Sequence, residues 1–76
     1  MSAITVYTTP NCPGCKLTMR ALNKRGFDYQ VINLADHPED IATMRALGHF
    51  QAPVVLLDDG RHWSGFRPDT IKNLVA

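Results

Sequence analysis

The sequence predicts an α/β fold in the order βαβαββα, with one four-stranded mixed sheet flanked by three helices. In the first half, segments with apolar residues at every second position are separated by segments with helical periodicity. This order is typical of parallel strands joined by a crossover helix. A hairpin signal then adds an antiparallel pair. The 76 residues, 45% of them hydrophobic, suit a single domain spanning residues 1–76, near the lower size limit for one core.

The spacing of apolar residues predicts the first strand and the first helix. Residues 3–7 alternate around Ile4 and Val6, and residues 8–11 form a loop. Residues 13–25 predict a helix, because proline suits its first position and apolar residues recur on one face. Those apolar residues are Leu17, Met19, Ala21 and Leu22. Gly26 is the expected stop.

The second strand is predicted over residues 28–34, and a helix follows it. Asp36 or His37 can cap this helix, and Pro38 fits its first position. Its first turn is acidic, and Gly48 is expected to end it. The expected buried stripe consists of Ile41, Met44 and Leu47.

The last part of the chain predicts a hairpin and a short helix. Residues 53–57 are continuously apolar, which suits a strand buried on both faces. Residues 58–60, Asp-Asp-Gly, are a turn signal, and residues 61–64 would be the returning strand. Pro68 opens a final helix. Its expected apolar residues are Ile71, Leu74 and Val75.

The two cysteines of the chain, Cys12 and Cys15, stand where the first helix should begin. Backbone N–H groups are unpaired at a helix N-terminus and the dipole is positive there, so a thiolate is stabilised. A C-x-x-C placed in this way is typical of redox-active dithiols. We expect Cys12 to cap the helix, exposed, and to attack a substrate disulfide. Cys15, one turn inside, would then resolve the mixed disulfide.

Two other uses of the cysteines fit the sequence less well. A structural disulfide would close a loop too short to constrain much of the unfolded chain. A structural zinc site needs four ligands. Only His37, His49 and His62 are available, no two of them have ligand spacing, and all three are expected at the surface in turns. We therefore expect no metal and no cofactor other than the redox-active Cys12–Cys15 pair.

Net charge and hydropathy limit the kinds of partner and the cellular location that we expect. A net charge of +1 argues against nucleic acid. No apolar run approaches transmembrane length, and the N-terminus lacks a signal-peptide pattern, so a monomeric cytoplasmic protein without a membrane partner is expected. Lys16, Arg20 and Lys24 share one helix face beside the dithiol. That face is either solvated or a docking face for an acidic partner.

The chain resembles the thioredoxin superfamily in its smallest form, and more closely the glutaredoxin-like NrdH redoxins. The resemblance covers essentially the whole chain. The segments that carry it are Thr5-Val6-Tyr7-Thr8, Cys12-Pro13-Gly14-Cys15, Arg25-Gly26-Phe27, Gln51-Ala52-Pro53-Val54-Val55 and Trp63-Ser64-Gly65-Phe66-Arg67-Pro68-Asp69. The last segment is the most specific, because ordinary glutaredoxins tend to have Gly-Gly and acidic residues there, which help to hold glutathione. The resemblance implies a dithiol hydrogen donor for the large subunit of a class Ib ribonucleotide reductase, reduced by thioredoxin reductase.

The chain departs from the NrdH pattern near the cysteines. Gly14 stands where Gln is usual, Thr9 stands where many members have a basic residue, and Pro-Gly reverses the Gly-Pro order of thioredoxins. The lack of a cation at Thr9 also disfavours the first alternative function, a glutathione-dependent glutaredoxin. A second alternative is a binding module that holds a metal or an iron–sulfur cluster between two copies.

The resemblance also implies roles for other residues. Pro13 and Gly14 support the dithiol, and Pro53 resembles the cis-proline that faces it, which would expose Ala52 for strand-like pairing with a substrate. Trp63 is either a core aromatic or part of a surface near the dithiol. The proposed partner-binding residues are Ala52, Trp63, Ser64, Gly65, Phe66, Arg67 and Lys16.

Overall fold

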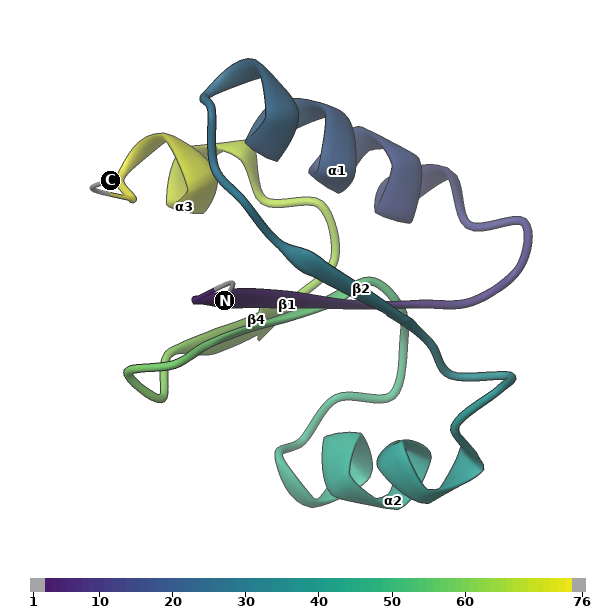
Figure 1. Ribbon diagram of the computed structural model, residues 1–76. Coiled ribbons are helices and arrows are strands. Elements are labelled where there is room, and N and C mark those ends of the chain that lie inside the picture. The colour runs from purple at the N-terminus through teal and green to yellow at the C-terminus, as the bar shows by residue number, and fades with distance from the viewer. Residues whose placement is uncertain (1–2, 75–76) are drawn as a thin grey trace.

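The computed structural model describes residues 3–74 and confirms the predicted fold class and element order (Figure 1). The elements are β1 (Ile4–Thr8), α1 (Pro13–Lys24), β2 (Gln30–Asn33), α2 (Pro38–Ala46), β3 (Val54–Leu57), β4 (His62–Ser64) and α3 (Pro68–Lys72). Among these residues, no helix is long and apolar enough to cross a bilayer.

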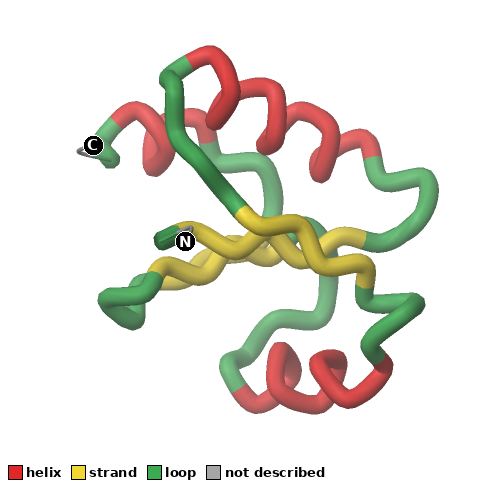
Figure 2. The backbone as a smooth tube through the Cα atoms, in the orientation of Figure 1, coloured by secondary structure: helices red, strands yellow, loops and turns green. Residues whose placement is uncertain are grey.

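The four strands form one mixed sheet in the order β2-β1-β3-β4. β1 runs parallel to β2 and antiparallel to β3, and β3 is antiparallel to β4. α1 and α3 cover one face of the sheet and α2 covers the other (Figures 1 and 2). The parallel pair therefore comes from the β1–α1–β2 crossover, and the antiparallel strands come from the hairpin, as the sequence predicts.

The sheet separates two apolar clusters. The larger cluster lies under α1 and α3, where its buried members are Ile4, Val6, Leu22, Val55, Leu57, Trp63 and Ile71. The smaller cluster lies under α2 and consists of Tyr7, Leu34, Met44 and Val54. The side chains of β1 and β3 alternate between the two clusters, because successive residues of a strand point to opposite faces. The central strands are thus buried on both sides.

The helix stops occur where they are predicted. Gly26 follows α1 with φ of 76°, and Gly48 follows α2 with φ of 90°. Both values lie in the left-handed region, which glycine enters without a steric penalty. At the start of α2, His37 is the N-cap residue and Pro38 occupies the first turn.

Several predicted boundaries and burials are wrong by small amounts. β1 includes Thr8, which was expected in the loop, and β2 is limited to four residues at the edge of the sheet. Leu47 is 38% exposed because α2 ends before it and it becomes the C-cap. Leu74 follows α3, where it packs against the larger cluster. Val75 lies outside the described residues.

Candidate active site

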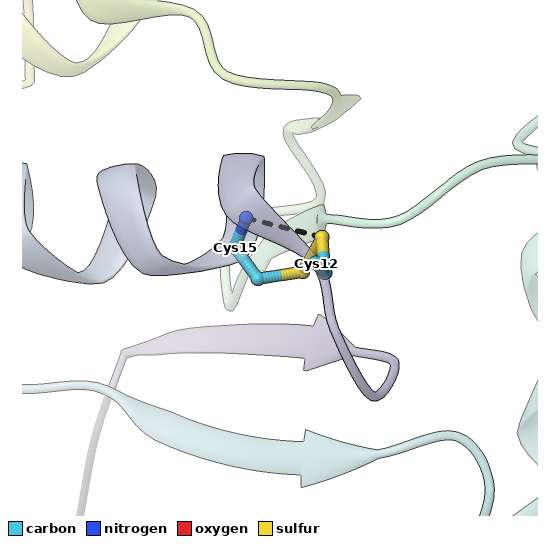
Figure 3. Close-up of a disulfide and its surroundings, with 2 residues drawn as sticks. All are labelled: Cys12 and Cys15. Carbon is cyan, nitrogen blue, oxygen red and sulfur yellow. Dashed lines mark hydrogen bonds between the residues drawn. A yellow bond between two sulfur atoms is a disulfide. The ribbon is translucent and has the colours of Figure 1, made fainter.

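The two cysteines lie at the N-terminus of α1 and form a disulfide (Figure 3). Cys12 is the N-cap residue, with φ of −106° and ψ of 101°, and the Cα atoms of Cys12 and Cys15 are 5.2 Å apart. The backbone N–H of Cys15 donates a hydrogen bond to the Cys12 Sγ at 3.1 Å. After reduction, this N–H and the positive end of the helix would favour the thiolate form of Cys12.

The two sulfur-bearing residues differ in exposure. Cys15 is 2% exposed, whereas Cys12 is only partly buried. An incoming disulfide can therefore reach Cys12 more readily than Cys15. This asymmetry supports the assignment of Cys12 as the attacking residue and Cys15 as the resolving residue.

Asn11 adopts a left-handed backbone conformation immediately before the dithiol. Its φ is 57°, and it is the one non-glycine residue with positive φ among residues 3–74. Asn tolerates this region better than most residues do. The turn at Asn11 leads the chain from β1 into the cap of α1, so it sets the direction in which Cys12 enters the helix. The sequence predicts Asn11 only as part of the loop over residues 8–11. Its place directly before Cys12 is the local signal for this turn.

We expect Asn11→Val to lower both stability and activity. A β-branched residue is strongly disfavoured at positive φ, and the left-handed region costs an ordinary L-residue about 1–2 kcal/mol. Asn11→Gly is the matched control, because it adopts this conformation freely and should keep activity close to that of the wild type. Thermal unfolding and insulin reduction would be measured for both variants. Equal unfolding midpoints for the Val variant and the wild type would contradict the role of this turn.

The loop before β3 packs against the dithiol turn. The Ala52–Pro53 bond is cis, as expected, and Pro53 is buried. A Cβ atom added to Gly14 would lie 3.2 Å from the Pro53 Cδ, which is tighter than most carbon contacts. Gly14 therefore allows the turn and the proline to approach closely. This contact gives a physical meaning to the glycine that departs from the NrdH pattern.

Ala52 presents an unpaired backbone beside the dithiol. Within residues 3–74, neither its N–H nor its carbonyl forms a backbone hydrogen bond. The carbonyl of Pro53 is already paired, because the Gly65 N–H donates to it at 2.8 Å. This bond connects the segment after β4 to the proline loop. Ala52 is thus the position where an extended substrate can add backbone hydrogen bonds.

The candidate partner-binding residues divide into exposed and buried groups. Trp63 is 6% exposed and belongs to the larger core cluster, so its assignment to a partner surface is corrected. The cause is register: Trp63 lies opposite Val55, whose side chain faces the same cluster. Phe66, at 37% exposure, and Arg67 are at the surface.

The other candidate partner-binding residues also differ in exposure. Ser64 and Gly65 are partly buried, and Gly65 has the positive φ, 83°, that a turn glycine allows. Lys16, one residue after Cys15, is exposed on α1. Arg20 and Lys24 on the same helix are also exposed. The exposed members of the set are thus Lys16 on α1 and the Phe66–Arg67 pair after β4.

Tyr7 is a core residue near the end of β1. It is 9% exposed and packs in the cluster under α2. Burial, with a smaller contribution from the charge of Asp40, raises the pKa of its hydroxyl above the usual value. Tyr7 therefore remains a neutral core residue at physiological pH.

The thioredoxin-like sheet, with a C-x-x-C at the start of α1 and a cis-proline packed against it, defines a thiol–disulfide oxidoreductase of the redoxin class. Comparison with known proteins supports this class. A family model described as Glutaredoxin matches residues 4–63. The glutaredoxin-like protein NrdH of Escherichia coli (strain K12) is 48% identical over 71 residues, 93% of this chain and 86% of the relative.

Two more comparisons extend the match. The glutaredoxin-like protein NrdH of Lactococcus lactis subsp. cremoris is 34% identical to this chain. The match covers 95% of this chain and 99% of the relative. A solved structure of the NrdH-redoxin from Escherichia coli, described as having a thioredoxin-like activity profile, has a TM-score of 0.89 at 46% identity. The match covers 96% of this chain and 95% of that one. The chain belongs to the NrdH glutaredoxin-like proteins, within the glutaredoxin family.

Proposed function

We propose that the reduced protein delivers electrons to the large subunit of a class Ib ribonucleotide reductase and regains them from thioredoxin reductase. The observation that carries the proposal is the difference in exposure at the N-terminus of α1, where Cys12 is partly exposed and Cys15 is buried. Membership of the NrdH group supports the choice of partners. The thioredoxin-like activity profile of the Escherichia coli relative, 46% identical, supports the choice of reductant.

The proposed reaction moves two electrons in two exchange steps. The Cys12 thiolate attacks one sulfur of the partner disulfide, so a mixed disulfide forms and one partner thiolate leaves. Cys15 then loses its proton and attacks the Cys12 Sγ. This step breaks the mixed disulfide, releases the second partner thiolate and leaves the Cys12–Cys15 disulfide. The partner disulfide is reduced, and the dithiol of this chain is oxidised. Thioredoxin reductase returns both electrons.

The surface around Cys12 supports a protein rather than a small molecule as the partner. Ala52 offers an unpaired backbone for an extended segment, and Phe66 with Arg67 adds side-chain types that are enriched at protein interfaces. The exposed cations of α1 would attract an acidic partner and raise the rate of association.

We propose that the Cys12–Cys15 pair is the only redox group of the chain and that no cofactor or metal takes part in the exchange. We also propose that it acts as a monomer in the cytoplasm, where cellular reductants keep thiols reduced. Two thiolates are half of a four-ligand set, so a cluster-binding role would require a second copy.

A glutathione-dependent glutaredoxin is the second candidate, because the Glutaredoxin family model matches residues 4–63. The groove beside Ala52 does not favour it. This groove is lined mainly by apolar side chains from the turn after β2, from α2 and from the loop that follows α2. Arg45 is the one Lys or Arg side chain among its described lining residues. Glutathione has two carboxylates, so few charge-assisted contacts are available to it there.

A reconstituted electron chain tests the proposed acceptor. NADPH, thioredoxin reductase, this protein and a class Ib ribonucleotide reductase should together form deoxyribonucleotide at a rate that rises with the concentration of this protein. The measurement is product formation with ribonucleotide as substrate, and dithiothreitol serves as the positive control for the reductase. Rapid reduction of insulin in the same mixture, without deoxyribonucleotide, would contradict the acceptor while keeping the disulfide reductase chemistry.

A further inference from the structure

Two histidines from separate segments meet on the side of the sheet that α2 covers. His49 follows the C-terminal end of α2, and His62 is the first residue of β4. The His49 Nε2 lies 2.6 Å from the His62 Nδ1, and the two rings are nearly perpendicular, with an interplanar angle of 81°. The histidines were expected at the surface in turns. His62 is exposed, as expected, but lies in β4, and His49 is partly buried. The fold brings together two imidazoles that are 13 residues apart.

The two facing nitrogens have the chemistry of metal ligands. In the present arrangement one of them carries a proton and donates it to the other. A neutral imidazole carries one proton, which can occupy the ring nitrogen that faces away from the other histidine. The lone pairs of His49 Nε2 and His62 Nδ1 are then both free to bind one ion. The structure therefore offers a neutral two-nitrogen ligand pair without the loss of any buried group, since His62 is exposed and His49 is partly buried.

The spacing is close to that needed for a single ion. Metal–nitrogen bonds of about 2.0–2.1 Å place two ligands on one ion about 2.9–3.4 Å apart, for square or tetrahedral angles respectively. The observed 2.6 Å separation must therefore open by less than about 1 Å. Side-chain torsions of surface imidazoles supply such a movement without moving the sheet.

The local charges also suit a cation. Within residues 3–74, neither His49 nor His62 forms an ion pair with a carboxylate that would hold it protonated. The side chain of Arg61, next to His62, is bound to Asp59 at 2.8 Å, so its charge is already compensated.

We infer that His49 and His62 form a binding site for one divalent transition-metal ion of the kind that favours imidazole, such as Zn²⁺ or Cu²⁺. Water completes the coordination. The site is separate from the cysteine pair in chemistry, because it requires only nitrogen ligands and remains available in the disulfide form. It joins the loop that leads to Pro53 with the strand that leads to Phe66. An ion bound there would hold together two of the segments that border the dithiol.

The test uses the full chain, without a histidine tag, in the disulfide form, so that no thiolate can bind the ion. Titration calorimetry with ZnCl₂ and with CuCl₂ at pH 7.5 should show one ion per chain, with Cu²⁺ bound more tightly than Zn²⁺. His49→Gln and His62→Gln should each weaken binding by about tenfold or more, since loss of a ligand costs at least as much as loss of its supporting contacts. A Cu²⁺ electron paramagnetic resonance spectrum should show coupling to two nitrogens.

His37→Gln is the matched control. It also removes one imidazole, but from a different group, in which His37, Glu39 and Asp40 have ligand atoms within 4.8 Å of one another. This variant should bind the ion as the wild type does. Thermal unfolding without metal checks that all three variants fold. The inference is overturned if the wild type shows no one-to-one binding, if binding survives either the His49 or the His62 substitution, or if it disappears only with His37.

Discussion

Cys12→Ser should abolish disulfide reduction, whereas Cys15→Ser should produce a protein that is trapped as a mixed disulfide with its partner. The serine hydroxyl is far too weak a nucleophile at neutral pH, so we expect the first variant to lose at least about a thousandfold in rate. In the second variant the accessible Cys12 still attacks, because it remains at the N-terminus of α1 with the residue 15 N–H directed at its sulfur. The step that would release the partner is missing.

The two variants are best compared by mass spectrometry after incubation with a disulfide substrate. We expect an adduct on Cys12 in the Cys15→Ser protein and none on Cys15 in the Cys12→Ser protein, because Cys15 is 2% exposed. Both variants lose the disulfide, so reduced wild type is the matched control for unfolding. Adducts formed chiefly on Cys15 would reverse the assignment of the two roles. This experiment does not depend on which protein is the natural partner.

Local signals in the sequence were sufficient to predict most of the fold. Proline at the first helical position and glycine shortly after the last turn marked the two ends of α2: Pro38 begins the helix, and Gly48 follows its C-cap. These signals act within a few residues, so they can be read without knowledge of tertiary contacts. Burial is different. Leu47 has the spacing of a buried residue, but it lies just past the last turn of α2, and local signals do not fix a helix boundary to a single residue.

The site shows the same division between local and long-range information. The positions of Cys12 and Cys15 follow from one short motif at a strand–helix junction. Whether Trp63 belongs to the core or to a surface depends on which face of the sheet β4 presents, and strand register sets that face. The meeting of His49 and His62 depends on the path of the loop after α2. No local pattern encodes it, because the two residues belong to different elements.

Thioredoxin reductase with NADPH should reduce the Cys12–Cys15 disulfide efficiently, and glutathione with glutathione reductase should do so poorly. A charge-assisted hydrogen bond contributes about 1.5–3 kcal/mol. A site that lacks one of them should therefore hold glutathione at least about tenfold more weakly than one that has it. Thr9 supplies no cation, and Arg45 is the one Lys or Arg side chain among the residues that line the groove beside Ala52.

The reductase should instead contact the protein through its exposed surface after β4. Phe66→Ala and Arg67→Ala should each raise the KM for thioredoxin reductase severalfold, as expected when a central interface side chain contributes about 1 kcal/mol or more. Neither change should affect folding greatly, because both residues are at the surface. Val31→Ala is the matched control: Val31 is 47% exposed on β2, at the opposite edge of the sheet, and its loss should leave the KM unchanged.

Both electron sources should be assayed side by side by NADPH consumption, with insulin as the final acceptor and equal concentrations of this protein. The two arms share the same exchange step at Cys12, so a difference between them reports on recognition of the reductant rather than on thiol chemistry. Faster turnover with glutathione than with thioredoxin reductase would replace the proposed function with the glutaredoxin alternative. A KM that responds to Val31 as strongly as to Phe66 would instead place the reductase on another face of the sheet.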